Sequence, residues 1–238
     1  MKLGIECIVK AINEPQLDRA LEAVYNQTLP FAKITLINGV CPEVLAHNLA
    51  LSVLEHEWSL WVDGDVILYP DAHETVKKCM DRKSSFIEYG FGLYDTFLQR
   101  DICCCAVRQS EFHKKFKYKD IIANDTECAK RMKQAGWSYQ RFWREGVIIG
   151  THFDDPDDFQ VFRRFYGRGF KAIGKGKAVR RYNTELKNLH ASSGDKRYKI
   201  ALKAFNYAIE RKHYPTSKNV EFEEGVYEEW MRTNLQLL

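Results

Sequence analysis

Two aspartates separated by a single glycine, Asp63 and Asp65, are the strongest candidates for chemistry in this chain of 238 residues. They directly follow the apolar run 58–62, and Pro70 after them can begin a helix. Two carboxylates at this spacing can bind a hard divalent cation, Mn²⁺ or Mg²⁺. Such an ion can bridge the phosphates of a nucleoside diphosphate and stabilise the charge on that group as it departs. We therefore expect a metal-assisted phosphate site at Asp63 and Asp65.

A second copy of the pattern, Asp155 and Asp157, shows that the spacing alone is weak. The chain contains 14 aspartates, enough for about one such pair to arise by chance in a sequence of this length. The second copy lies in a polar stretch around Pro156, where capping a helix is the expected role of an aspartate. The first copy, Asp63 and Asp65, follows an apolar strand, and this position favours it as the functional one.

The elements around this site alternate between strand and helix patterns over the first 110 residues. Three apolar runs are predicted strands: 3–9, 33–37 and 58–62. Three helix patterns follow them in turn: one beginning at Pro15, then 42–55 and 70–81. This order predicts an α/β fold in which a mainly parallel sheet carries helices on both faces.

Polar residues follow each of the three predicted strands. Asn13 and Glu14 come after the first, Asn38 and Gly39 after the second, and Asp63 after the third. Ligands of open α/β sheets bind beyond the carboxyl ends of the strands. These residues therefore predict a ligand site at one edge of the sheet.

The rest of the chain continues with shorter elements and then becomes helical. Further predicted strands are 84–94, 102–107, 138–143 and 146–149. The helix pattern 125–135 ends at Gly136, a residue that favours the C-cap. We predict a core at 1–156 and a basic helical extension packed on it at 157–238.

Several segments resemble the family-2 glycosyltransferases, which have a Rossmann-like GT-A fold and an Asp-x-Asp metal motif. The similar segments are, in order, Asn13-Glu14-Pro15, Asn26-Gln27-Thr28, 45–50, 58–70, 106–112, and Asn124-Asp125-Thr126-Glu127 followed by Arg131 and Gly136. The resemblance spans about residues 3 to 152, and it implies a GT-A fold, in which a mixed, mainly parallel sheet is flanked by helices.

The resemblance implies roles at the metal and at the acceptor. Asp65, with Asp63, would hold Mn²⁺ or Mg²⁺, and His152 resembles the histidine that completes the metal site in some GT-A enzymes. Asp125 matches the family's catalytic base, which takes the proton from the acceptor hydroxyl. The alternatives are a structural histidine at position 152 and an ordinary helix N-terminal carboxylate at position 125.

The resemblance also implies residues that bind the nucleotide-sugar donor: Ala11, Glu14, Asn38, His47 and Asp63. Asn38 stands where the family usually has a carboxylate, and its amide can accept a hydrogen bond from a uracil or guanine N–H. A UDP- or GDP-sugar is therefore the expected donor. His47 replaces the family's arginine and is a weaker, pH-dependent phosphate partner; Asn124 stands where the family commonly has glutamate.

The segment 163–218 contains 16 Lys and Arg against 3 Asp and Glu, which predicts an anionic partner. Its basic residues include Arg163, Arg164 and Arg168, and its glycines 167, 169, 174 and 176 interleave with Lys171, Lys175 and Lys177. We expect a flexible lid that closes on the donor diphosphate, with Arg168 as a contact. The alternatives are a solvated face, an acidic glycan, a lipid-linked acceptor with peripheral membrane contact, or nucleic acid, for which no recognised motif is present.

We predict a glycosyltransferase that moves a sugar from a nucleotide-diphosphate sugar to a hydroxyl on a glycan, lipid-linked or protein acceptor. One base at Asp125 suffices for direct displacement, which favours inversion. Trp137, Tyr139, Phe142 and Trp143 can stack on acceptor sugars, although packing in the core is the more frequent use of such residues.

Two other functions stay open. A sugar nucleotidyltransferase needs a glycine-rich phosphate loop, and residues 9–13 contain no glycine, which counts against it. A non-catalytic glycan- or nucleic-acid-binding module on the same fold is the main alternative.

Cellular location is predicted from what the sequence lacks. No apolar run approaches the roughly 20 residues of a membrane span, and residues 1–10 have no signal-peptide pattern. The seven cysteines show no zinc-binding spacing and are odd in number, which indicates reduced thiols. We expect a cytoplasmic protein.

Overall fold

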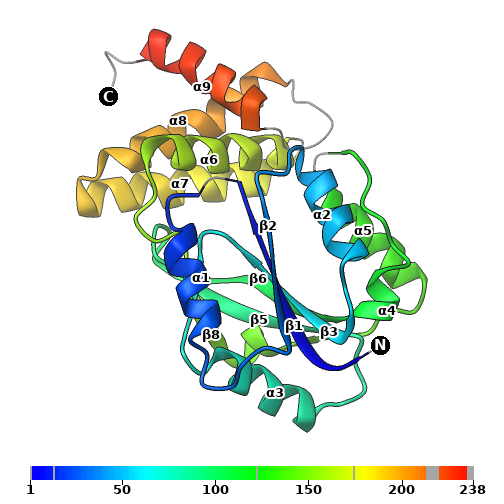
Figure 1. Ribbon diagram of the computed structural model, residues 1–238. Coiled ribbons are helices and arrows are strands. Elements are labelled where there is room, and N and C mark those ends of the chain that lie inside the picture. The colour runs from blue at the N-terminus through cyan, green and yellow to red at the C-terminus, as the bar shows by residue number, and fades with distance from the viewer. Residues whose placement is uncertain (1, 13, 122, 174, 213–219, 235–238) are drawn as a thin grey trace. The chain divides into compact units, whose positions relative to one another are not determined.

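The computed structural model describes residues 2–12, 14–121, 123–173, 175–212 and 220–234 (Figure 1). Asn13 and Gly174, both named above, lie outside the described residues. The chain divides into two compact units, an α/β unit (1–119 and 124–155) and a helical unit (120–123 and 156–238). Among the described residues, no helix combines the length and apolar character that crossing a bilayer requires.

The strands of the α/β unit form a mixed sheet, as predicted. They are β1 (Lys2–Ala11), β2 (Lys33–Asn38), β3 (His56–Asp63), β4 (Val66–Leu68), β5 (Glu88–Asp95), β6 (Arg100–Gln109), β7 (Tyr139–Arg141) and β8 (Ile148–His152). The order is β2-β1-β3-β6-β5-β8-β4, with β7 beside β5. The pairs β1/β2, β1/β3, β5/β7 and β5/β8 are parallel, whereas β6 is antiparallel to both β3 and β5, and β4 is antiparallel to β8.

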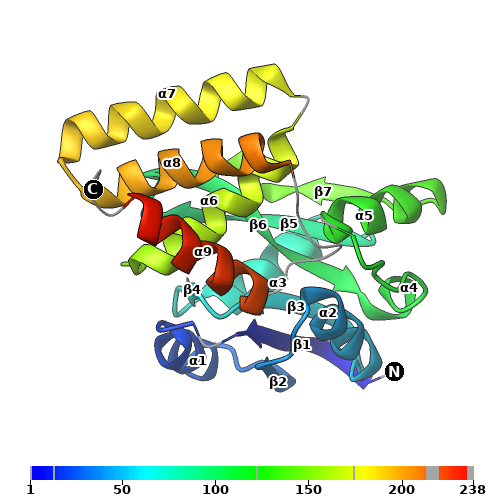
Figure 2. The same ribbon diagram turned by 90° about the horizontal axis from the view of Figure 1, so that it is seen from above.

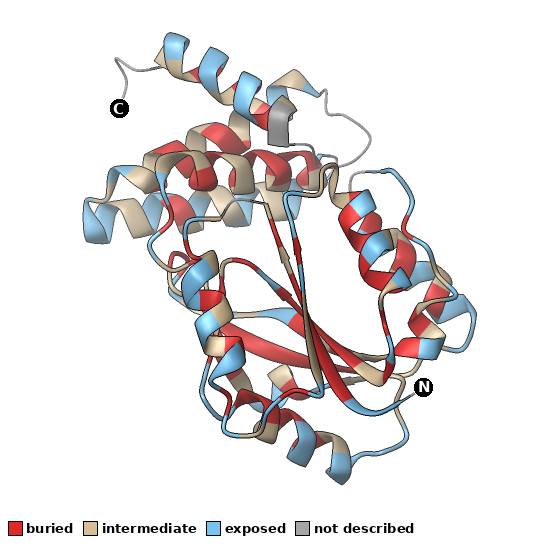
Figure 3. Ribbon diagram, in the orientation of Figure 1, coloured by how far each residue is buried: buried red, intermediate tan, exposed pale blue. Residues whose placement is uncertain are grey.

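Alternation of side chains along β1 divides the core between the two sheet faces. Cys7 and Val9 join the core that includes residues of α1 (Leu17–Tyr25) and α3 (Ala72–Arg82). Ile8 joins the other core, which includes residues of three helices. They are α2 (Glu43–Ser52), α4 (Ser110–His113) and α5 (Asn124–Gln134). The central strands are coloured as buried over much of their length in Figure 3, as expected of a sheet that has a core and helices on each face.

Two short elements differ from the sequence prediction. β4 has three residues, too few to show a period of two, and it was not predicted. The predicted strand 138–143 stops at Arg141, because a 3₁₀ turn begins at Phe142. The Phe142 side chain is fully buried and stacks on Phe91, so it packs in the core and is not available to an acceptor sugar.

The helical unit contains α6 (Asp158–Ala172), α7 (Gly176–Ser193), α8 (Lys196–Arg211) and α9 (Val220–Asn234), and Figure 2 shows α7 beside α8. A capping box begins α6: the Asp157 carboxylate accepts the N–H of Gln160 at 2.7 Å, and the Gln160 side chain accepts the N–H of Asp157 at 3.0 Å. The second Asp-x-Asp copy therefore caps a helix, as predicted.

For two of the glycines expected to form a flexible lid, that expectation is wrong. Gly167 and Gly169 lie inside α6 and are buried. A Cβ at Gly169 would lie 2.4 Å from the carbonyl oxygen of Phe205 and 2.7 Å from the Cβ of Ala208. Gly169 therefore allows α6 and α8 to approach closely, which is a packing role that gives the segment no mobility.

Candidate active site

The carboxyl ends of β1, β2 and β3 lie side by side and bring predicted site residues together. The β1/β2 register pairs Ala11 with Asn38, and the β1/β3 register pairs Lys10 with Asp63. The N–H of Gly64 donates to the carbonyl oxygen of Lys10 at 2.7 Å, which continues the ladder past the end of β3. Ala11, Asn38 and Asp63 therefore share one edge of the sheet.

Gly64, between the two aspartates, allows their turn to lie against β1. A Cβ at this position would lie 2.8 Å from the Cβ of Ala11 and 3.2 Å from Oε2 of Glu14. The Glu14 carboxylate also accepts a hydrogen bond from the N–H of Ile12, which holds the loop after β1 in place. Sterically, the residue between Asp63 and Asp65 must be glycine.

Asp63 is held by a lysine that the sequence analysis did not single out. The ammonium of Lys10 lies 2.9 Å from Oδ1 of Asp63, 3.0 Å from Nε2 of His47 and 5.5 Å from the ring centre of Trp61. Because an ammonium has only donors, Nε2 of His47 accepts, and a neutral His47 then carries its proton on Nδ1. The positive charge beside the strand ends therefore belongs to Lys10, with the buried His47 behind it.

Asp65 faces a different partner, His152 at the end of β8. Nε2 of His152 lies 3.5 Å from Oδ2 of Asp65, and Nδ1 lies 3.1 Å from Oδ2 of Asp95. Asp95 is fully buried at the end of β5, and its Oδ1 accepts the N–H of Leu98 at 2.8 Å. An Nδ1–H directed at the Asp95 carboxylate leaves the lone pair of Nε2 pointing toward Asp65.

Asp95 was missed in the sequence analysis, although it carries the signal that identified Asp63. Each is an aspartate at the end of an apolar strand pattern. What the sequence does not show is that β5 and β8 are neighbours, with Asp95 in register opposite His152.

Asp65 and His152 fit a divalent cation of the Mn²⁺ or Mg²⁺ type. Two ligands at neighbouring positions of an octahedral ion are about 3 Å apart, close to the 3.5 Å between Oδ2 and Nε2. Within the described residues, no group of three or more His, Cys, Asp or Glu could hold an ion. A cation held by two side chains would need further ligands, and Mg²⁺ commonly takes them from water and substrate phosphates. Asp63, the other expected metal ligand, forms an ion pair with Lys10, and its role at the metal stays a prediction.

Asp125 lies in the first turn of α5 and is exposed. The neighbouring Asn124 donates from Nδ2 to Oε2 of Glu43 at 3.4 Å, and Glu43 begins α2 directly after the loop that follows Asn38. The start of α5 therefore lies next to the start of α2. Asp125 is thus placed on the same side of the sheet as the carboxyl end of β2.

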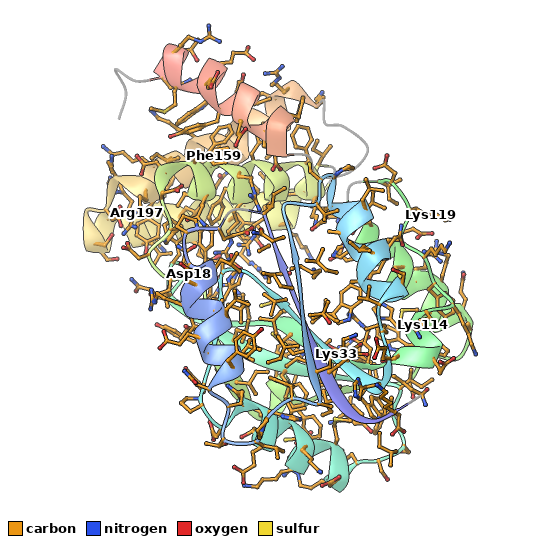
Figure 4. All side chains as sticks on the ribbon, in the orientation of Figure 1. Asp18, Lys33, Lys114, Lys119, Phe159 and Arg197 are labelled. Atoms are coloured by element: carbon orange, nitrogen blue, oxygen red, sulfur yellow. The ribbon has the colours of Figure 1, made fainter. Side chains whose placement is uncertain are left out.

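Glu127, the second acid of this turn, is held in ion pairs. It lies 2.8 Å from Arg131 and 2.9 Å from Lys119, a residue labelled in Figure 4. The hydrogen bond from Arg131, followed by that from Lys119, lowers the pKa of Glu127 to about 2. Glu127 is therefore a permanently charged structural acid, and Asp125 is the better candidate for a proton acceptor at this position.

The buried His113 packs against Trp61, the ring that lies next to the Lys10 ammonium. His113 lies 4.7 Å from Trp61 between ring centres, and its Nε2 is 3.0 Å from the Tyr118 hydroxyl. Burial lowers the pKa of His113 well below its usual 6.5, and the positive charges of Arg108 and Lys10 act in the same direction. His113 is therefore neutral at pH 7 and structural.

The remaining predicted residues have contacts of their own. Arg168 is in the helical unit, where its guanidinium lies over the rings of Phe165 at 5.3 Å and Tyr182 at 5.6 Å. Its contact with the donor stays a prediction. In the α/β unit, Trp137 and Tyr139 stack on each other with ring centres 5.0 Å apart.

A mixed, mainly parallel sheet flanked by helices is the GT-A-like fold, and solved glycosyltransferases share it with this chain. A mannosyltransferase, PcManGT from Pyrobaculum calidifontis, solved with GDP-Man and Mn²⁺, has a TM-score of 0.50 and 15% identity, covering 99% of this chain and 81% of its own. TarS 1–349 of S. aureus has a TM-score of 0.50 and 12% identity, covering 88% and 81%. Its complex with UDP has a TM-score of 0.50 and 11% identity, covering 89% and 88%. No protein-family model and no curated protein matches the sequence.

Proposed function

We propose that this chain is a metal-dependent glycosyltransferase that moves a sugar from a UDP- or GDP-sugar to a hydroxyl acceptor with inversion. The observation that carries the proposal is the pairing of Asp65 with His152 beyond the carboxyl ends of the strands, with Asp95 behind the histidine. In an open α/β sheet this is the edge where ligands bind. The acceptor hydroxyl belongs to a glycan, a lipid-linked sugar or a protein.

In this proposal the residues of the strand ends bind the donor. Asp65 and His152 hold Mn²⁺ or Mg²⁺, and that cation neutralises charge on the diphosphate when bound. Asn38 accepts a hydrogen bond from the nucleobase, and Glu14 and Ala11 shape the loop beneath the nucleoside. Lys10, paired with Asp63, supplies a positive charge at the same edge.

Asp125 acts as the base. Its carboxylate takes the proton from the acceptor hydroxyl as that oxygen bonds to the anomeric carbon. The bond from that carbon to the diphosphate breaks at the same time, and its electron pair leaves with the nucleoside diphosphate. One base on one face of the sugar suffices for such a displacement, so inversion follows.

The proposal is tested by separating donor binding from transfer. Asp65→Asn is expected to abolish the Mn²⁺-dependent part of UDP or GDP binding, measured by calorimetry. Asp125→Asn is expected to keep that binding and to lower turnover of the donor by about 10²- to 10⁴-fold, because general-base catalysis contributes that much. Asp81→Asn, an exposed acid at the end of α3, is the matched control and should change neither.

Two results would contradict the proposal. Near-full turnover in Asp125→Asn would remove the base assignment while leaving the metal site intact. Metal-independent, strongly salt-dependent binding of DNA or RNA, with no binding of nucleotide sugars, would favour the alternative of a non-catalytic nucleic-acid-binding module.

A further inference from the structure

Helix α7 of the helical unit carries exposed cations along one side. Lys177, Arg180, Arg181 and Lys187, which we call the basic stripe, are all exposed. The other three residues follow Lys177 by three, four and ten positions. Because a helix turns once every 3.6 residues, these spacings place all four on one helix face. Thr184, Asn188 and Ala191 complete this exposed face. The face is therefore free of acids and about 15 Å long over the basic stripe.

The opposite side of α7 fixes the direction in which the basic stripe points. The ring of Tyr182 lies 5.3 Å from that of Phe205 on α8, and Leu186 is fully buried. Nδ1 of His190 lies 3.1 Å from the carbonyl oxygen of Asp195, at the start of α8. These contacts hold α7 against α8, and Figure 2 shows the two helices side by side. Because the basic stripe lies on the opposite side of α7, it faces away from α8.

Four acids of the helical unit are engaged with other cations. Their ion pairs are Lys196–Asp158 at 3.0 Å, Arg197–Asp195 at 2.8 Å, Arg211–Glu229 at 2.8 Å and Arg163–Glu223 at 3.5 Å. Within the described part of the chain, no residue of the basic stripe forms an ion pair with a carboxylate. Like charges three and four residues apart destabilise a helix. The basic stripe is therefore poised for anions from outside the chain.

The shape of this face favours a flat anionic surface over a nucleic-acid strand. Single-stranded nucleic acid is bound in basic grooves with aromatic side chains that stack on the bases. The basic stripe lies on a single convex helix, and its exposed face carries no aromatic residue. Clusters of four or more Lys and Arg on a helix are typical of contact with anionic lipid headgroups.

We infer that the basic stripe docks this protein on the anionic headgroup surface of a lipid bilayer. With Ala191 as its one apolar residue, this face rests on the headgroups and does not enter the hydrocarbon. The docking is electrostatic and reversible, and it requires neither donor nor metal. If the proposed transferase activity holds, docking brings the enzyme to acceptors that are linked to lipid.

The test is sedimentation of the full chain with vesicles of phosphatidylcholine, with and without about a third phosphatidylserine. Wild-type protein is expected to sediment with the anionic vesicles alone and to be released as salt rises, because salt screens exposed charges. The stripe variant changes Lys177, Arg180, Arg181 and Lys187 to Gln. Each cation is worth about fivefold in binding, so we expect a loss of several hundredfold.

A control variant matches the change in net charge. It changes four exposed lysines of the α/β unit to Gln: Lys115, Lys117, Lys130 and Lys133. This variant is expected to bind the vesicles nearly as well as wild type. A second variant, Arg180→Lys with Arg181→Lys, keeps the charge and should keep binding even if the fourfold variant loses helix content by circular dichroism.

Several outcomes would overturn the inference. Wild-type protein that ignores anionic vesicles, or a stripe variant that binds them as wild type does, would remove it. Equal losses in the stripe and control variants would reduce it to a net-charge effect. Tighter binding to single-stranded DNA or RNA than to vesicles of equal total charge would replace the bilayer by nucleic acid. None of these results depends on donor binding, so the proposed transferase is judged separately.

Discussion

Replacing Asp95 by asparagine removes a buried charge from the α/β unit and keeps the size of the side chain. The asparagine Oδ1 can still accept the N–H of Leu98, as the Asp95 carboxylate does at 2.8 Å. Its Nδ2 then faces Nδ1 of His152, which lies 3.1 Å from Oδ2 of Asp95. An amide N–H in that position donates to Nδ1 and moves the ring proton to Nε2. A protonated Nε2 cannot bind a cation, so His152 is lost to the proposed metal site.

Losing a carboxylate behind a metal-binding histidine costs about 10- to 100-fold in metal affinity, and we expect that loss for Asp95→Asn. The assay is calorimetric titration of Mn²⁺ in the presence of saturating UDP or GDP. Asp65→Asn should lose more, since it removes a ligand itself. Asp101→Asn, an exposed acid on the neighbouring strand β6, should bind Mn²⁺ as wild type does. Unchanged Mn²⁺ affinity in Asp95→Asn, with a clear loss in Asp65→Asn, would refute the role given to Asp95.

Two further predictions concern stability. Gly169→Ala should lower the free energy of unfolding by about 1–3 kcal/mol through overpacking between α6 and α8, whereas Gly167→Ala, whose Cβ meets no atom within 4 Å, should raise it by about 1 kcal/mol. Chemical denaturation measures the free energy of unfolding of both variants. Equal effects of the two substitutions would contradict the close approach of the helices. His113 binds a proton below about pH 6.5 in the unfolded chain and stays neutral in the folded one. The free energy of unfolding should therefore fall by up to about 1.4 kcal/mol for each pH unit below that value. His113→Phe should reduce this slope in urea titrations at several pH values, and an unchanged slope would contradict it.

The first three strands and their carboxyl-end residues were predictable from the sequence. Their apolar runs end at polar residues, and parallel strands place those ends at one edge, so Asn38 and Asp63 were found. The direction of β6 was not predicted, because a short apolar run alone does not show which way a strand runs. The first strands and helices of the α/β unit thus followed from patterns that span a few residues each.

The missed features depend on contacts between distant parts of the chain. Lys10 became part of the site because the register of β1 and β3 places it opposite Asp63, and because Nε2 of His47 lies 3.0 Å from its ammonium. Asp95 did so because β5 and β8 are neighbours. Gly169 looked like a source of mobility, yet it lies where two helices cross. A glycine has the same local conformational preferences in a mobile segment and at a helix crossing. Only its packing neighbours distinguish the two roles.

The pairing of Lys10 with Asp63 leads to a final prediction about the donor. Lys10→Met keeps an apolar stem over Trp61 and removes the ammonium, which leaves the Asp63 carboxylate without that partner at the edge where a diphosphate would bind. We expect affinity for UDP or GDP to fall by about 10- to 100-fold, since a hydrogen bond to a charged group contributes about 1.5–3 kcal/mol.

A matched control separates this effect from the loss of any strand lysine. Lys33→Met removes an ammonium that pairs with Glu55 at 2.7 Å at the start of β2, the opposite end of the sheet (Figure 4). Because exposed pairs of this kind contribute about 1 kcal/mol or less to stability, it should leave nucleotide affinity unchanged. Equal nucleotide affinity in wild type and Lys10→Met would show that Lys10 merely neutralises Asp63. The anion would then have to be bound by other groups at the strand ends, with Asp65 and its cation as the first to examine.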